Sequence, residues 1–179
     1  MARNVEIKAR IESVESLIPR VAPLADSGPT TFQQDDMFFP CPNGRLKLRK
    51  RSETDGELIF YLRENCAEPK ESFYVLAPTT APDALREALV LGYGVIGQVR
   101  KTRTLFMVGR TRIHLDSVEG LGEFLELEVM LAENEPVDAG QRIARELLDK
   151  LGVSTEELVP GAYIDLLDRR EKAYAQRGR

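Results

Sequence analysis

The sequence predicts an α+β fold, in which a barrel of about eight antiparallel strands carries helices on its outside. Three observations support this prediction. Most of the chain consists of runs in which apolar and polar residues alternate, which is the period of a β-strand. Clusters of turn-forming residues separate these runs. Only a few segments have their apolar residues at helical spacing.

The strands can be placed in order along the chain. The first is expected at residues 3–11, where Val5, Ile7 and Ala9 alternate with polar side chains. The turn residues from Pro40 to Gly44 end the second strand. The strands expected after the first are residues 30–39, 45–51, 57–63, 70–77, 95–108, 110–118 and 122–131.

The helices are fewer. Pro19 shortens or kinks the first of them, Thr80 is expected to cap the second, and Gly152 ends the third. The helices expected are residues 14–25, 81–91, 138–151, 155–158 and 161–172. A length of 179 residues suits a single domain, which we place at residues 1–170, and we expect the charged tail at 171–179 to fray.

Composition excludes several classes of protein. The chain has 25 basic and 29 acidic residues, a net charge of −4, which argues against a general nucleic-acid-binding protein. No apolar run approaches the ~20 residues that span a bilayer. The N-terminus has no apolar segment typical of a secretory signal, so we expect a cytoplasmic protein without a membrane partner.

The residues available for chemistry are also limited. Cys41 and Cys66 are the two cysteines, and they form no CxxC pair, which argues against a structural zinc site or a disulfide framework. His114 is the one histidine, so no site can use several imidazole ligands. We expect His114 to be a hydrogen-bonded structural residue, with contact to a base or leaving group as the alternative. Any chemistry must come mainly from carboxylates and cations.

Charges of one sign gather on single strand faces. Every second residue from Arg45 to Arg51 is basic, whereas Glu126 and Glu128 share one face of a later strand. Five acidic residues and no basic one occur between Asp116 and Glu128. Charges this dense repel one another unless a cation lies among them, and Mg²⁺ prefers carboxylate and phosphate oxygens. The pattern predicts a polar lumen, acidic on one side and basic on the other, for a metal–polyphosphate complex.

Several motifs then resemble, in order, those of the CYTH domain family of triphosphate tunnel enzymes, which includes class IV adenylate cyclases and thiamine triphosphatases. The segment Asn4–Lys8 is similar to the family's ExExK signature, and Ile113–Glu128 is similar to its C-terminal acidic motif. The other matching segments are Arg45–Arg49, Leu58–Arg63, Lys101 with Arg103, and Gly161–Leu167. The resemblance implies an eight-stranded antiparallel tunnel that binds a triphosphate with Mg²⁺ or Mn²⁺.

The resemblance also implies roles for individual residues. The expected metal ligands are Glu6, Asp116, Glu126 and Glu128. The expected phosphate-binding residues are Lys8, Arg45, Lys47, Arg49, Arg63, Lys101 and Arg103. The expected catalytic residues are Glu6, Lys8, Asp116 and Glu126. One of Asp35 and Asp36 is a further candidate for the lumen, and the pattern does not decide between them.

The first glutamate of the signature is Asn4 here, which brings no negative charge. Three functions therefore stay open. The leading one is a class IV adenylate cyclase-like enzyme that converts ATP to cyclic AMP and pyrophosphate. The alternatives are a hydrolase of thiamine triphosphate, inorganic triphosphate or a nucleoside triphosphate, and a module that binds a nucleotide or polyphosphate without turnover. We expect a monomer or a homodimer.

Overall fold

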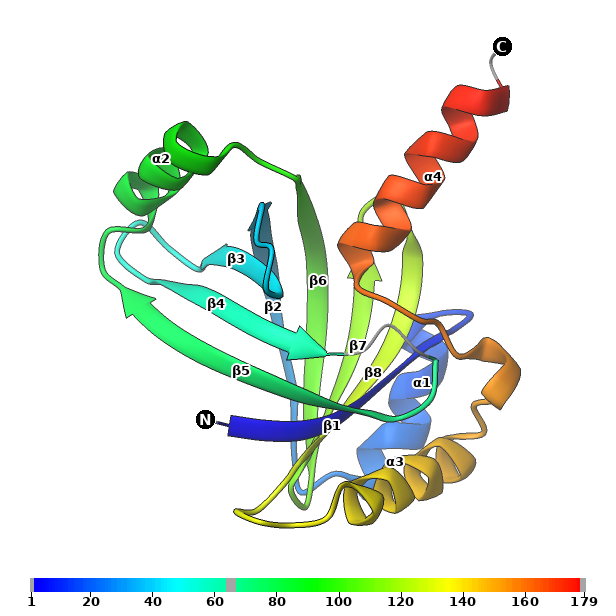
Figure 1. Ribbon diagram of the computed structural model, residues 1–179. Coiled ribbons are helices and arrows are strands. Elements are labelled where there is room, and N and C mark those ends of the chain that lie inside the picture. The colour runs from blue at the N-terminus through cyan, green and yellow to red at the C-terminus, as the bar shows by residue number, and fades with distance from the viewer. Residues whose placement is uncertain (1, 64–66, 178–179) are drawn as a thin grey trace.

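The computed structural model describes residues 2–63 and 67–177, and for Arg63 it describes the backbone alone. Its eight strands close into an antiparallel barrel in the order β1-β5-β4-β3-β2-β6-β7-β8 (Figure 1). The predicted fold class is thus confirmed. The strands are β1 (Ala2–Arg10), β2 (Ser27–Phe39), β3 (Arg45–Lys50), β4 (Gly56–Arg63), β5 (Lys70–Thr79), β6 (Gly97–Val108), β7 (Thr111–Val118) and β8 (Gly122–Met130).

The N-terminal strand closes the ring. Strand β1 pairs with β8 along most of its length and with β5 through its first half. The other non-sequential pair joins β2 to β6, and the remaining neighbours are connected in sequence order. A closed ring leaves no long strand edge unpaired, which removes a site of edge-to-edge aggregation.

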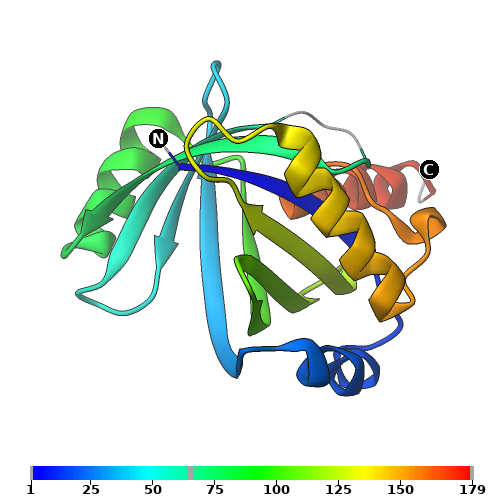
Figure 2. The same cartoon turned by 90° about the horizontal axis from the view of Figure 1, so that it is seen from below.

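Alternation along each strand separates two environments. In β1, Val5, Ile7 and Ala9 point outward and are fully buried, whereas Asn4, Glu6 and Lys8 point into the ring. The apolar core therefore lies outside the barrel, beneath the helices α1 (Val14–Val21) and α3 (Val137–Leu151), as Figure 2 shows from below. Each fully buried aliphatic side chain contributes about 1.5–3 kcal/mol. This packing frees the interior of the barrel for polar side chains.

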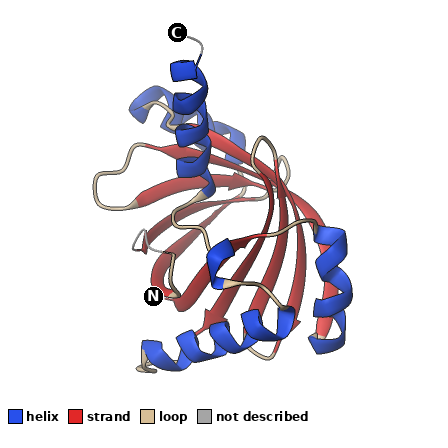
Figure 3. Cartoon of the chain, turned by 90° about the vertical axis from the view of Figure 1, so that its right-hand side faces the viewer, coloured by secondary structure: helices blue, strands red, loops and turns tan. Residues whose placement is uncertain are grey.

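The helices cover the outside and one end of the barrel (Figure 3). Helix α2 (Pro82–Tyr93) packs on β2 and β3 through Leu89 and its neighbours. Helix α4 (Tyr163–Arg177) begins against the lumen and then leaves the barrel. Two short 3₁₀ turns, η1 (Ala22–Leu24) and η2 (Thr155–Glu157), complete the elements of the described chain.

Some expected boundaries were wrong. Helix α1 ends at Val21 and tightens into η1, because Pro19 lies inside it and Pro23 follows. Thr80 does not cap α2: the helix begins after Ala81, which makes no side-chain capping bond. Helix α4 continues to Arg177, beyond the expected end at residue 172. Among the described residues, every helix is too short or too polar to cross a membrane.

Candidate active site

The lumen of the barrel holds a cavity of about 390 Å³ whose walls come from all eight strands. Most of the residues predicted for the site point into it. The predicted residues that line the cavity are Glu6, Lys8, Lys47, Arg49, Lys101, Arg103, Glu126 and Glu128. They are brought together because each lies at an inward position of its strand.

Strand register sets which of these side chains are neighbours. Lys8 of β1 lies opposite Glu126 of β8, and Glu6 lies opposite Glu128. On the other side of β8, Glu126 lies opposite His114 of β7. Opposed residues on one face of an antiparallel pair have Cβ atoms about 5 Å apart. One row of the wall is therefore Lys8, Glu126 and His114.

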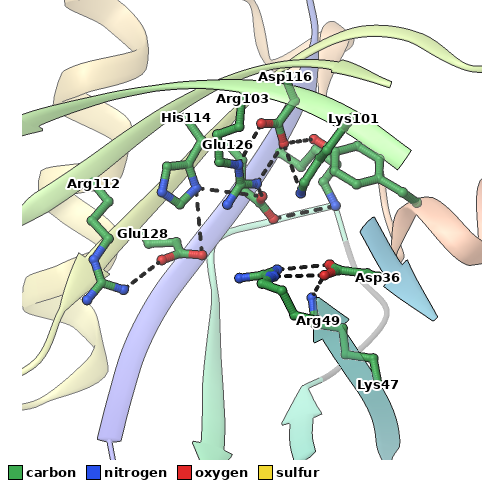
Figure 4. A network of polar contacts seen from close by, with 12 residues as sticks. Asp36, Lys47, Arg49, Lys101, Arg103, Arg112, His114, Asp116, Glu126 and Glu128 are labelled. Atoms are coloured by element: carbon green, nitrogen blue, oxygen red, sulfur yellow. Dashed lines mark hydrogen bonds and ion pairs between the residues drawn. The ribbon is translucent and has the colours of Figure 1, made fainter. Parts of the chain in front are cut away.

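The basic strand β3 meets a buried carboxylate that lies on β2. Asp36 accepts hydrogen bonds from Lys47 at 2.7 Å and from Arg49 at 2.7 and 2.8 Å (Figure 4). Burial of Asp36 opposes its ionisation, but the charges of Lys47 and Arg49 hold its pKa well below the usual range. Both cations are thus fixed at the cavity wall, with their positive charge partly balanced.

A second pair of cations lies on β6. The guanidinium of Arg103 donates two hydrogen bonds of 2.6 Å to Asp116 and one of 2.6 Å to Glu126. Lys101 lies 3.3 Å from the same Asp116, and the hydroxyl of Tyr163 donates to it at 2.8 Å (Figure 4). This network fixes the position of Arg103 in the cavity wall.

Asp116, one of the expected metal ligands, lies behind the wall of the cavity. Its exposed fraction is 0%, and it does not line the cavity. Arg103, Lys101 and Tyr163 occupy its oxygens, and they stand between it and the lumen. Burial works against the charge of Asp116, yet Arg103 and Lys101 keep its pKa below the usual range. In this structure Asp116 thus contacts two cations of the cavity wall and does not itself line the cavity.

The two lysines nearest α4 share one aromatic ring. The ammonium of Lys8 lies 4.0 Å from the centre of the Tyr163 ring, and that of Lys101 lies 4.9 Å from it. Lys8 also donates to the carbonyl of Gly161 at 3.2 Å and lies 3.6 Å from Glu126. Burial, helped by the charge of Arg103, lowers the pKa of Lys101 to about 8.

The acidic wall holds three groups that could bind a metal. One ligand atom each from His114, Glu126 and Glu128 lies within 4.8 Å of the others (Figure 4). The imidazole Nδ1 is 3.9 Å from Glu126 and 3.8 Å from Glu128. Burial opposes ionisation of both glutamates, whereas Lys8 lowers the pKa of Glu126 and His114 that of Glu128. Burial lowers the pKa of His114 itself.

The donors of this wall fit a divalent cation. Glu6 lines the cavity opposite Glu128, so carboxylates from two neighbouring strands approach one another at the same level. Such a like-charge pair is destabilising on its own. Carboxylate oxygens at this density are the ligands that Mg²⁺ and Mn²⁺ take in proteins.

One predicted phosphate-binding residue, Arg45, is not brought to the lumen. Arg45 is paired with Asp165 of α4 through two hydrogen bonds of 2.7 Å, beside a second cavity of about 310 Å³. The side chain of Arg63 lies outside the described residues, as does Cys66. Cys41 is a free, half-buried thiol away from the site.

The sequence does not decide on one member of the site and misses another. It does not distinguish Asp36 from Asp35, because the end of β2 is buried on both faces and its alternation is weak. The strand pairing identifies Asp36 as the inward residue, because Asp36 of β2 lies directly opposite Arg49 of β3. Tyr163 belongs to a helix start, and no spacing in the sequence places it against a strand.

Comparison with known proteins gives a consistent result. The family model described as the CYTH domain matches residues 2–163. An adenylate cyclase, CyaB of Aeromonas hydrophila, is 24% identical over 93% of this chain and 89% of its own length. A candidate adenylate cyclase of Methanocaldococcus jannaschii is 30% identical over 91% of this chain and 97% of its own. The PH1012 protein of Pyrococcus horikoshii shares the fold, with a TM-score of 0.80 at 24% identity, over 92% of this chain and 99% of that one.

Proposed function

Because the chain belongs to the CYTH domain family, we propose that it is a divalent-metal-dependent enzyme that acts on a triphosphate inside its barrel. For the reaction we propose that of the relatives named adenylate cyclase: conversion of ATP to cyclic AMP and pyrophosphate. In this reaction the ribose 3′-oxygen loses its proton and bonds to the α-phosphorus. The bond from that phosphorus to the bridging oxygen breaks, and pyrophosphate leaves.

One observation carries the proposal. Four cationic side chains line a single cavity with the carboxylates of β1 and β8: Lys47 and Arg49 come from β3 on the far side of the ring, and Lys101 and Arg103 come from β6 beside the carboxylates. An unliganded structural barrel gains nothing from burying this many charges, because desolvation of each ion costs several kcal/mol. A triphosphate bound to a metal ion carries charges complementary to these side chains: its anionic oxygens match the cations, and its metal ion matches the carboxylates.

The roles of the residues follow from their contacts. Arg49 and Arg103 use Nε and Nη2 on Asp36 and Asp116, so within the described part of the chain the Nη1 atom of each is the donor left for a phosphate oxygen. Lys47 and Lys101 would act as point charges. Asp36 and Asp116 hold these cations in place before substrate arrives. Glu6, Glu126 and Glu128 would hold Mg²⁺ or Mn²⁺, which supplies charge neutralisation and polarisation of a phosphoryl oxygen when it is bound. Lys8, between Glu126 and Tyr163, is placed to contact the phosphates near that ion.

A second function is favoured by one residue. Asn4 lines the cavity at the position of the first glutamate of ExExK, and its Oδ1 is buried without a hydrogen-bond partner among the described residues. The amide adds no charge, which weakens any second metal position. A barrel with one weakened metal position could bind a triphosphate without turning it over.

Phosphorus NMR separates these functions. Purified protein is incubated with Mg²⁺ and, in parallel, with ATP, inorganic triphosphate or thiamine triphosphate; reactions with Mn²⁺ are treated with a chelator before measurement. Cyclic AMP and pyrophosphate from ATP support the proposed reaction. Orthophosphate release replaces it with a triphosphatase, whose substrate is the one consumed fastest. If no resonance changes although the triphosphate binds, the protein is a binding module. The Arg49→Gln variant controls for contaminating phosphatase.

A further inference from the structure

His114 occupies an unusual place in the acidic wall. It is the one histidine of the chain, it is 4% exposed, and it lines the cavity. Its Nδ1 is buried and has no hydrogen-bond partner among the described residues. The nearest carboxylate oxygens, of Glu126 and Glu128, are 3.9 and 3.8 Å away, beyond the range of an N–H···O hydrogen bond. The expectation of a hydrogen-bonded structural histidine is therefore not met at Nδ1.

Both carboxylates are also hydrogen-bonded to arginines. The Oε2 atom of Glu126, which lies 3.9 Å from Nδ1, accepts a hydrogen bond of 2.6 Å from Arg103, so an ion bound at that oxygen would share it with the guanidinium. The Oε2 atom of Glu128 accepts one of 3.3 Å from Arg112, which leaves Oε1 directed at the imidazole. Because β7 and β8 are paired throughout, the backbones of His114 and Glu126 are fixed relative to each other. The nitrogen and the two oxygens thus face a common point from a rigid frame (Figure 4).

The spacing suits an ion better than it suits direct contact. Ligand atoms about 2.0–2.2 Å from one metal ion are separated by about 3–4 Å from each other. The separations of 3.8 and 3.9 Å around Nδ1 fall in this range. An imidazole nitrogen is a poor ligand for Mg²⁺, which prefers oxygen, and a good one for first-row transition ions.

We propose that the Nδ1 atom of His114 is a direct ligand of the divalent ion, together with Glu126 and Glu128, and that it makes the site select Mn²⁺ or Co²⁺ over Mg²⁺. This inference rests on the metal dependence of the proposed function and deepens it. The selectivity comes from the imidazole nitrogen. The four metal ligands expected from the sequence are all carboxylates and supply only oxygen. The lumen would then bind a triphosphate best as its transition-metal complex.

The single histidine makes the direct test sharp. The protein, without a polyhistidine tag, is prepared once at natural abundance and once with ¹⁵N-histidine, and Mn²⁺ is added below one equivalent. Electron spin-echo envelope modulation then reports nitrogen bound to Mn²⁺. The expected result is a nitrogen modulation that changes from the ¹⁴N to the ¹⁵N pattern in the labelled protein. Mn²⁺ that binds with no modulation from the labelled residue overturns the proposal.

A second measurement tests selectivity with matched variants. Calorimetric titration with Mg²⁺, Mn²⁺ and Co²⁺ compares wild type with His114→Gln, which keeps an oxygen ligand and removes the nitrogen. The preference for Co²⁺ over Mg²⁺ is expected to fall on the order of tenfold. Arg112→Gln is the control, because it removes a charge beside Glu128 without touching the nitrogen and is expected to shift all three affinities together. An unchanged preference in His114→Gln contradicts the proposal.

The outcomes also separate this inference from the proposed function. If Mn²⁺ binds without nitrogen coupling and the triphosphate still binds with Mg²⁺, the histidine proposal fails and the function stands. If neither Mn²⁺ nor Mg²⁺ binds with or without triphosphate, both fail. Circular dichroism of each variant confirms that it is folded before its titration is interpreted.

Discussion

Glu6 and Glu128 lie directly opposite each other on the neighbouring strands β1 and β8, and both side chains line the lumen. Two carboxylates in this relationship destabilise a sheet by about 0.2–1 kcal/mol. The barrel keeps them nonetheless, beside Glu126 and in one cavity with the cations of β3 and β6. A divalent ion among these carboxylates would offset their mutual repulsion.

The Glu128→Gln variant should be slightly less stable than wild type when no metal is present. Although burial opposes its ionisation, His114, Arg103 and Arg112 lower the pKa of Glu128 in the folded protein and so stabilise its charge. We expect the free energy of unfolding to fall by less than about 1 kcal/mol, since the contact with Arg112 is partly exposed. The variant should also lose most of the stabilisation that Mg²⁺ gives. Glu119→Gln, in an exposed turn, removes the same charge and should do neither. Denaturant unfolding with and without Mg²⁺ measures both; an undiminished Mg²⁺ response in Glu128→Gln would contradict this prediction.

Neighbouring aspartates should respond in opposite ways. Asp36→Asn leaves buried Lys47 and Arg49 without their counter-ion and should cost about 3 kcal/mol of stability. Asp35→Asn, on the outer face of β2, should cost less than about 1 kcal/mol. In the lumen, Asp36→Asn also removes a competitor for the two cations, so the thermal shift produced by inorganic triphosphate should increase. Equal stabilities of the two variants, or a smaller shift in Asp36→Asn, would argue against this role.

Triphosphate affinity should fall as the pH rises through about 8. Burial, with the charge of Arg103, lowers the pKa of Lys101 from 10.5 to about 8. Above that pH the empty site must take up a proton to present a charged ammonium, so affinity should decline by up to about tenfold per pH unit. Calorimetry between pH 7 and 9.5 measures the decline. Lys101→Arg keeps its charge and should remove most of it; an identical decline in that variant would assign the effect to another group.

The same shift has a defined sign for stability. The folded protein releases the Lys101 proton near pH 8, whereas the unfolded chain holds it until about 10.5. Between these values the unfolded state binds more protons, so this group makes the free energy of unfolding increase with pH. Lys101→Met should flatten that part of the stability profile.

Asn4→Glu should strengthen metal binding. It places a third carboxylate near Glu6 and Glu128 at a position whose present amide oxygen is buried without a partner among the described residues. If turnover is limited by a weak second metal position, the variant should raise turnover and lower the Mg²⁺ concentration for half-maximal rate. Asn4→Gln matches the added length without the charge and should do neither. If Asn4→Glu leaves the Mg²⁺ dependence unchanged, residue 4 does not contribute to a metal position and the prediction is wrong.

Much of the fold could be predicted because the strands alternate strictly. The inward positions of β1, β3 and β8 follow from single-residue alternation, so Glu6, Arg49 and Glu126 could be assigned to one lumen before their contacts were known. Element ends were less predictable, since Pro19 and the start of α2 depend on local turn geometry. Alternation determines the face of the strand on which a side chain lies. It does not determine whether an inward side chain reaches the cavity or lies behind its neighbours.

Because alternation does not say how far a side chain lies from the cavity, the sequence could not place every charged residue of the site. Asp116 and Arg45 both occupy alternating charged strands, yet Asp116 lies behind Arg103, and Arg45 reaches Asp165 of a helix distant in sequence. The ion pair between Glu126 and Arg103 could not be predicted from the sequence either, because no basic residue lies in the acidic run that contains Glu126. Such contacts depend on the closing of the ring and on the docking of α4.

The most direct test of the central claim is calorimetric binding of inorganic triphosphate to wild type, Arg49→Gln and Glu128→Gln, each with and without Mg²⁺. If the lumen holds a metal–triphosphate complex, wild type binds tightly only with Mg²⁺, Arg49→Gln binds weakly in both conditions, and Glu128→Gln loses the gain that Mg²⁺ provides. Equal affinity of all three proteins, independent of Mg²⁺, would contradict the account.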